Sequence, residues 1–239
     1  MIQHYNKAPL PFTGQKRNFI KQFKTALTQI PDDGAGWTIV DVFGGSGLLA
    51  HVAKRCKPAA RVIYNDFDGY AKRIQSIPDV NRLRHQLLPI VQHLPRNTLL
   101  DKDIKAQVVA AIKNFDGYVD LHCLCSWFLF SSQQAGSLGE FFNRYFYNGI
   151  RLNDVPIADD YLDGLEITHD SFDQLLPPFY QQDKTLLILD PPYVSTNQSA
   201  YARHGYFGMV KFLRLMAWVR PPFIFFSSTR SELMDYLNF

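Results

Sequence analysis

The chain has 239 residues, of which 46% are hydrophobic and 20% are charged, and its formal net charge at pH 7 is +3. This length and apolar content suit one large α/β domain with a smaller inserted domain. The sequence has no apolar run of about 18 residues and no signal-peptide core, which disfavours membrane and secreted proteins and predicts a cytoplasmic one. Its cysteines, Cys56, Cys123 and Cys125, form no CxxC pair, so we expect no metal site.

The charged residues are unevenly distributed along the chain. The first 30 residues contain no acid and five basic residues, which are Lys7, Lys16, Arg17, Lys21 and Lys24. By contrast, residues 154–173 contain seven acids. A basic face suits a phosphate backbone, and ordinary solvated helix faces explain the same pattern equally well.

The N-terminal segment leads into an amphipathic helix. Residues 8–16 contain two prolines and a glycine and predict an irregular approach. Apolar residues then recur at helical spacing, which predicts a helix from Gln15 to Gln29. Lys16 falls in its first turn, where a cation is unfavourable to the helix dipole. Its side chain is either simply exposed or binds an anion, such as a cofactor carboxylate, over the helix start.

A strand, a glycine-rich turn and a helix follow. Residues 37–43 are apolar and β-branched and predict a buried strand, residues 44–47 are Gly-Gly-Ser-Gly, and residues 48–54 open a helix. Glycines let the backbone turn tightly and approach a ligand closely. The spacing is neither GxGxxG nor that of a P-loop, so the turn by itself is weak evidence for a nucleotide.

The second predicted strand ends in a carboxylate. Arg61 to Asn65 form this strand, and Asp66 follows the glycine turn by about 20 residues, where βαβ units place a ribose-binding acid. Asp68 is a second candidate for that role, or the N-cap of the next helix. The turn and the acid together indicate a ligand of the adenosine type.

Residues 76–159 lack the alternation of strands and helices. Apolar residues recur at helical spacing in 83–94, 104–115 and 138–146, which predicts a helical insert between catalytic segments 1–75 and 160–239. The side chains that could contact phosphates or bases are Arg82, Arg84, Lys102, Lys105, Lys113, Asn143, Arg144, Tyr145, Phe146, Tyr147, Asn148 and Arg151. For each one taken singly, a core or solvated position is the better interpretation.

The chain then returns to the sheet. Asp163 to His169 predict a turn and a short strand, and a helix is expected from Phe172 to Tyr180. Asp170 lies between them and is a candidate N-cap of that helix.

The most informative stretch is Leu186 to Tyr193, in which four apolar residues run into Asp-Pro-Pro-Tyr. The apolar run predicts a buried strand of a parallel sheet, and the prolines, which lack an N–H donor, end it. Asp190 therefore lies at the carboxyl edge, where open α/β sheets bind ligands. A carboxylate, backbone carbonyls and the Tyr193 ring together suit a flat, amine-bearing substrate. The alternative is that Asp190 caps a helix and Tyr193 packs in a loop.

A polar loop from Val194 to Tyr206 follows and is a candidate lid. For His204 in this loop, a solvated position is favoured over a catalytic base. A helix from Phe207 to Val219 and a strand from Phe223 to Ser228 complete the predicted sheet.

Four stretches, in this order, resemble the motifs of Dam-type (D12 class) DNA adenine methyltransferases. Phe12-Thr13-Gly14-Gln15-Lys16 is similar to their N-terminal motif and Asp41-Val42-Phe43-Gly44-Gly45-Ser46-Gly47 to their cofactor motif. Asn65-Asp66 is similar to their ribose-binding acid and Asp190-Pro191-Pro192-Tyr193 to their catalytic motif. The resemblance covers roughly residues 1–70 and 165–239.

The resemblance implies a Rossmann-like methyltransferase sheet that transfers a methyl group from S-adenosyl-L-methionine to N6 of an adenine flipped out of double-stranded DNA. The implied catalytic residues are Asp190, Pro191, Pro192 and Tyr193. The implied cofactor-binding residues are Phe12, Lys16, Asp41, Phe43, Gly44, Gly45, Ser46, Gly47, Asp66 and Asp170. In this family the insert reads the target sequence, and a cognate restriction nuclease is a possible partner.

Two alternatives stay open from the sequence. The same chemistry could act on another exocyclic amine, such as cytosine N4, an RNA base or an amide. Alternatively, the chain could be a truncated, non-catalytic remnant that binds DNA or cofactor. The resembled enzymes usually continue into a closing β-hairpin, whereas this sequence ends at Phe239. Three explanations are open: the sheet is shorter than in the family, a partner covers its edge, or this form of the protein is truncated.

Overall fold

The structure is a computed structural model that describes residues 4–192 and 207–227. The chain divides into two compact units. The first, here called the sheet unit, comprises Met1–Ala8, Gly14–Ala71 and Asp160–Phe239. The second, here called the helical unit, comprises Pro9–Thr13 and Lys72–Asp159.

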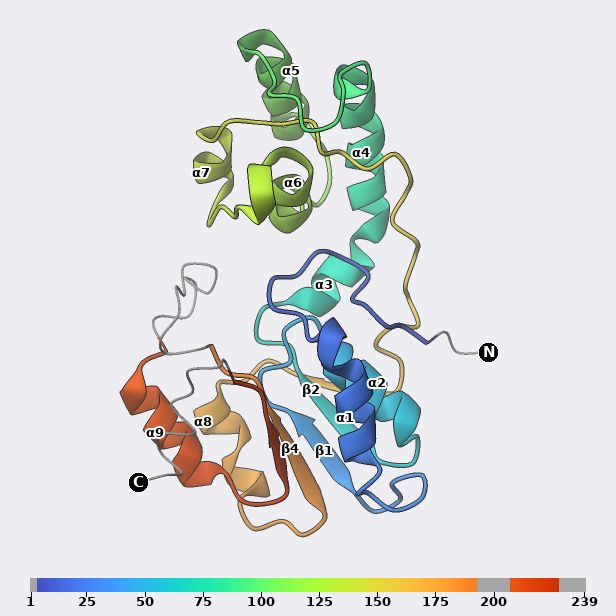
Figure 1. The fold of residues 1–239 in the computed structure, drawn as a ribbon, viewed down its shortest axis with the longest axis vertical. Coiled ribbons are helices and arrows are strands. Elements are labelled where there is room, and N and C mark those ends of the chain that lie inside the picture. The colour runs from blue at the N-terminus through green and yellow to red at the C-terminus, as the bar shows by residue number, and fades with distance from the viewer. Residues whose placement is uncertain (1–3, 193–206, 228–239) are drawn as a thin grey trace. The chain divides into compact units, whose positions relative to one another are not determined.

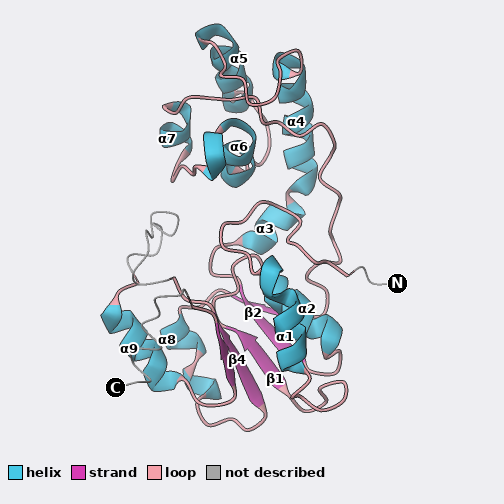
Figure 2. Cartoon of the chain, in the orientation of Figure 1, coloured by secondary structure: helices cyan, strands magenta, loops and turns pink. Residues whose placement is uncertain are grey.

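The sheet unit contains five parallel strands in the order β3-β2-β1-β4-β5. Figure 2 labels β2, β1 and β4 of this sheet. They are β1 (Thr38–Asp41), β2 (Arg61–Asn65), β3 (Glu166–Thr168), β4 (Thr185–Leu189) and β5 (Phe223–Phe225). This arrangement confirms the predicted α/β fold class. The strand order reverses between β1 and β4, and open α/β sheets bind their ligands at the carboxyl edge beside such a reversal.

Helices cover both faces of the sheet (Figure 1). They are η1 (Arg17–Phe19), α1 (Ile20–Leu27), α2 (Leu48–Cys56), α8 (Phe172–Leu175), η3 (Pro177–Phe179) and α9 (Met209–Trp218). Successive strand residues point to opposite faces. Ile39 and Ile188 pack with α1 and α2, whereas Val40 and Leu187 pack with α8 and α9. Burial on both faces explains why these strands are continuous apolar runs.

Element boundaries differ from the predictions where local chemistry intervenes. The predicted helix from Gln15 begins instead as the short 3-10 helix η1 and continues as α1. The predicted helix from Phe172 to Tyr180 divides into α8 and η3. Pro177 and Pro178 cause this break, because proline cannot donate the intrahelical hydrogen bond.

The helical unit is built from α4 (Ile77–Val91), α5 (Lys102–Lys113), α6 (Leu121–Phe128), η2 (Phe130–Ser132) and α7 (Leu138–Phe142). The short helix α3 (Tyr70–Gln75) joins the two units. The predicted third helix of the insert ends at Phe142, and Tyr147 instead forms an antiparallel bridge with Leu99. In the parts of the chain that the structure describes, no helix is long and apolar enough to cross a membrane.

A buried ion pair stabilises the helical unit internally. Arg73 and Asp120 are 5% and 2% exposed, with Nε 2.7 Å and Nη2 3.1 Å from the carboxylate oxygens. Asp120 also accepts the Cys123 N–H at the start of α6. Burial raises the pKa of Asp120, but the Arg73 charge and hydrogen bonds outweigh this effect and leave the pKa below its ordinary value. The pair therefore remains ionised at neutral pH.

Several insert side chains proposed for DNA contact have structural roles. Arg84 is 3% exposed, forms an ion pair with Asp154 and donates to the backbone of residues 151 and 152. Phe146 is fully buried, and Asn148 donates to the Val91 and Leu94 carbonyls. Tyr145, by contrast, is 78% exposed.

Candidate active site

Lys16 and Asp190 meet at the carboxyl edge of the sheet. Lys16 Nζ lies 2.5 Å from Asp190 Oδ2, 2.8 Å from the Gly14 carbonyl oxygen and 5.9 Å from the centre of the Phe226 ring. The two side chains are only 11% and 18% exposed. In this structure the ammonium group of Lys16 forms an ion pair with a carboxylate of the same chain, and the predicted binding of a cofactor carboxylate stays a prediction.

Asp41 adds a second carboxyl group to this ion pair. It ends β1, is 1% exposed, and accepts a 3.2 Å hydrogen bond from the Ala50 N–H through Oδ2. Its Oδ1 has no hydrogen-bond partner among the described residues. Burial, followed by the charge of Asp190, raises the pKa of Asp41 to about 7, although the Ala50 N–H and Lys16 act in the opposite direction. Asp41 is therefore partly protonated at neutral pH.

The glycine turn packs directly on the ring of Tyr64. A Cβ atom on Gly44 would lie 2.4 Å from two Tyr64 ring carbons and 2.9 Å from the Asn65 carbonyl oxygen, so no side chain fits there. Gly45 and Gly47 have φ values of 50° and 70°, which glycine adopts without strain. Gly47 precedes α2, so the turn delivers the chain into the first turn of that helix.

Two buried tyrosines fix the carbonyl groups of the turn. The Tyr64 hydroxyl lies 2.8 Å from the Gly45 carbonyl oxygen, and the Tyr161 hydroxyl donates to the Ser46 carbonyl at 3.0 Å. Burial raises the pKa of both tyrosines well above the ordinary value, so both hydroxyls keep their protons. Tyr161 also stacks on His51, with ring centres 4.9 Å apart. These contacts hold the two carbonyls against the protein side of the turn.

Asp66 is buried at the end of β2 and is 1% exposed. Its Oδ1 accepts the Tyr70 N–H at 2.6 Å and lies 2.9 Å from the Tyr64 hydroxyl, while Oδ2 accepts the Ala71 N–H at 2.9 Å. Asp66 therefore accepts the N–H groups of two residues in the first turn of α3. A carboxylate has about four acceptor positions, so these contacts leave room for one more donor.

Asn65 fixes the backbone at Asp170. Its side-chain amide donates to the Val42 and Asp170 carbonyls at 2.9 and 2.8 Å and accepts the Asp170 N–H at 3.0 Å. The Asp170 side chain is exposed. The alternative prediction that Asp170 is the N-cap of α8 is wrong, because Ser171 occupies that position and hydrogen-bonds to Gln174.

The remaining predicted site residues have different surroundings. The Phe43 ring packs against Phe172 and Phe207, with centres 6.0 and 5.9 Å away, and Phe12 belongs to the helical unit. Pro191 is buried and Pro192 is half-buried after β4. The predictions for Tyr193, for the loop that contains His204 and for the chain after Ser227 fall outside the described residues.

The structure thus brings Lys16, Asp41 and Asp190 into one cluster in the sheet unit. Within residues 4–192 and 207–227, no group of three or more His, Cys, Asp or Glu side chains is placed to hold a metal ion. No sequence motif assigns a functional role to Tyr64 and Tyr161, whose hydroxyl groups contact the glycine turn. Strand alternation could have indicated Tyr64, since it lies two residues before Asp66, whereas Tyr161 lies in an irregular segment that carries no such signal.

Comparison with known proteins decides the family. The model of the D12 class N6 adenine-specific DNA methyltransferases matches residues 12–209. The chain belongs to this family. A Haemophilus influenzae protein named "Putative methyltransferase" is 52% identical to this methyltransferase over 237 residues, which are 98% of this chain and 80% of the relative.

The family assignment confirms the resemblance seen in the four sequence motifs. The methyltransferase is an enzyme whose substrate is DNA and whose product is methylated on N6 of adenine. The matched region includes the cluster of Lys16, Asp41 and Asp190 and the glycine turn.

Proposed function

We propose that the methyltransferase takes its methyl group from S-adenosyl-L-methionine and that Asp190 binds the amine of the target adenine. The observation that carries this proposal is the Lys16–Asp190 ion pair of 2.5 Å, at the carboxyl edge where the strand order reverses. Asp41, at the end of β1, lies near this pair, and the glycine turn follows β1 in sequence, which suits a nucleoside-type cofactor. Pro191 directly follows Asp190, and its backbone carbonyl suits a substrate amine.

The residues around the turn fit the parts of S-adenosyl-L-methionine. Lys16 would bind its carboxylate, and the open acceptor position of Asp66 would bind a ribose hydroxyl. The exposed Asp170 carboxylate, on a backbone fixed by Asn65, would accept the amine of its adenine. Gly44 to Gly47 would let the backbone approach the ligand, and the Phe43 ring would border it. When bound, the cofactor supplies an electrophilic methyl group on a positively charged sulfur.

Asp190 and Pro191 would prepare the adenine amine for attack. The N6 lone pair is delocalised into the ring, which makes the amine a poor nucleophile. Hydrogen bonds from the amine to the Asp190 carboxylate and the Pro191 carbonyl favour a more sp³-like nitrogen with an available lone pair. Orientation and charge placement are then the main contributions of the enzyme. Lys16 would balance the negative charge of Asp190 through their ion pair.

The remaining assignments rest on the family relationship. Tyr193 would stack on the target base, which must leave the duplex to reach the site. The helical unit would read the target sequence, and the exposed Tyr145 is its best candidate for base contact. A restriction nuclease partner and a cytoplasmic location stay predictions.

Replacing Lys16 by alanine tests the cofactor site. We expect the affinity for S-adenosyl-L-methionine to fall by at least about tenfold, or ~1.4 kcal/mol, in isothermal titration calorimetry. The matched control is Lys24→Ala, which removes an exposed lysine from α1 and should leave the affinity unchanged. If Lys16 served only to neutralise Asp190, its removal would leave an extra negative charge and would instead tighten binding of the cationic cofactor. That result would contradict the proposal.

A further inference from the structure

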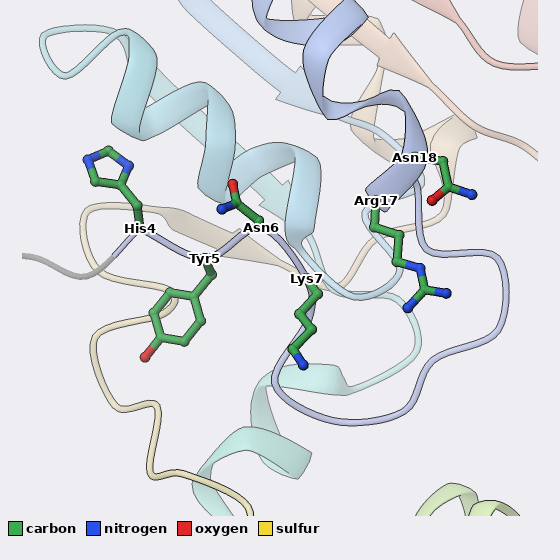
Figure 3. A pocket seen from close by; sticks show the side chains of 6 residues that line it. All are labelled: His4, Tyr5, Asn6, Lys7, Arg17 and Asn18. Atoms are coloured by element: carbon green, nitrogen blue, oxygen red, sulfur yellow. The ribbon is translucent and has the colours of Figure 1, made fainter.

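An open recess lies on the sheet unit beside the start of η1. It is lined by His4, Tyr5, Asn6, Lys7, Arg17 and Asn18 and encloses about 460 Å³ (Figure 3). Its lining contains two permanent cations and two amide side chains but no carboxylate. The mechanism proposed above uses none of these residues.

The recess is built on an anchored backbone. The Tyr5 N–H donates to His51 Nε2 at 3.2 Å, and the Tyr5 hydroxyl donates to Asp160 Oδ1 at 2.8 Å. The Ala8 N–H donates to Gln15 Oε1 at 3.2 Å. Lys7 therefore lies between two fixed residues, and little conformational entropy remains to be lost in its backbone when a ligand binds.

The two cations of the recess, Lys7 and Arg17, are exposed. Within the described ranges, no acidic side chain forms an ion pair with Lys7 or Arg17. The first 30 residues of the sequence contain no acid at all. In Figure 3 the two side chains extend in the same direction from neighbouring segments. The recess thus presents a local positive potential with neutral hydrogen-bond donors around it.

One residue of the recess is next in sequence to a residue of the proposed active site. Arg17 directly follows Lys16, whose ammonium group contacts Asp190. A base that enters the site from a duplex leaves its sugar–phosphate backbone at the mouth of the site. An anionic group of the substrate is therefore expected close to Arg17.

We propose that this recess binds a phosphodiester segment of the DNA substrate. Lys7 and Arg17 neutralise two backbone charges, and Asn6 and Asn18 donate neutral hydrogen bonds to phosphate oxygens. These contacts position the duplex for entry of the target base and carry no sequence information. The cofactor carboxylate is a less suitable occupant, since Lys16 already faces the cluster in which we place that group.

A double variant, Lys7→Ala/Arg17→Ala, tests the recess. Its affinity for a DNA duplex, measured by fluorescence anisotropy at several salt concentrations, should fall roughly tenfold or more. The slope of log affinity against log salt should become shallower by about 1.8, because each lost phosphate contact removes about 0.9. The matched control, Lys21→Ala/Lys24→Ala, removes the same charge from exposed positions of α1 and should change the slope much less.

Other outcomes would overturn the proposal. Equal slopes for the two double variants would show a general effect of net charge, and an unchanged affinity would show that DNA does not reach the recess. A loss of S-adenosyl-L-methionine affinity in calorimetry would place the recess in the cofactor site. The Lys7→Gln/Arg17→Gln variant removes the same charges but keeps polar side chains. An unchanged thermal unfolding midpoint in this variant would show that a loss of DNA affinity does not come from misfolding. DNA binding needs no methyl transfer, so the result is independent of the role proposed for Asp190.

Discussion

Replacing Asp190 by alanine should lower the rate of methyl transfer to DNA by about a thousandfold, the upper end of what a single lost polar contact to a reacting group costs. The variant loses the acceptor that we expect to hold the adenine amine, and it also leaves Lys16 without the carboxylate that lies 2.5 Å away. Transfer of a labelled methyl group to duplex DNA measures this effect. The affinity for DNA should change little, because the loss lies in the chemical step.

A control on the same strand separates chemistry from folding. Asp183→Ala removes an exposed acid near the opposite, amino-terminal end of β4 and should leave the rate unchanged. The rate of methyl transfer by Asp190→Asn should lie between the rates of Asp190→Ala and the natural enzyme. The amide oxygen of asparagine still accepts a hydrogen bond but carries no negative charge. An Asp190→Ala protein that transferred methyl groups at the full rate would rule out the mechanism.

Gly44→Ala should damage the glycine turn without adding any polar or charged group. The new Cβ would lie 2.4 Å from the Tyr64 ring and 2.9 Å from the Asn65 carbonyl, closer than real contacts, so the turn must move. Overpacking of this kind costs about 1–3 kcal/mol of stability. A displacement of about an ångström at a catalytic site can reduce activity by about a hundredfold. Thermal unfolding measures the loss of stability and transfer of a labelled methyl group measures the loss of activity, while calorimetry shows whether the affinity for S-adenosyl-L-methionine falls as well.

The matched substitution is Gly139→Ala in α7. There the nearest atom outside the helix backbone and the chain neighbours, Ser137 Oγ, lies 3.9 Å from the new Cβ, so the space is free. Alanine is the better helix former by up to about 1 kcal/mol, so stability should hold or rise. If Gly44→Ala bound cofactor as tightly as Gly139→Ala did, the glycine turn would have no part in the cofactor site.

The sheet was predictable because each strand carries its own signal. The sequence predicts a strand from Arg61 to Asn65 with the bounds that the structure shows, and it predicts a buried parallel strand in the apolar run before Asp190. Both faces of these strands are buried, so apolar residues are continuous and easy to identify. Because the strands are parallel, their carboxyl ends lie at the same edge of the sheet, and ligands of open α/β sheets bind at that edge.

The contacts at the site were harder to predict, because their partners lie far apart in the sequence. Nothing local to Lys16 indicates that its ammonium meets Asp190. The hydroxyl groups of Tyr64 and Tyr161 contact backbone carbonyls of the glycine turn. Every residue has a backbone carbonyl, so the residue types in the sequence do not indicate such contacts.

Helix caps show the same limit on a smaller scale. Asp170 and Ser171 are equally good caps by residue type. Which of the two caps α8 depends on the residue at which the helix begins, and residue type alone does not give that residue.

The central claim is that this methyltransferase modifies adenine N6 through Asp190. The most direct test is mass analysis of the nucleosides released from mixed-sequence duplex DNA after incubation with the protein and S-adenosyl-L-methionine. We predict N6-methyladenine with the natural sequence and at most a trace with Asp190→Ala. Methylation on cytosine N4, or N6-methyladenine in equal amounts with both proteins, would contradict the account.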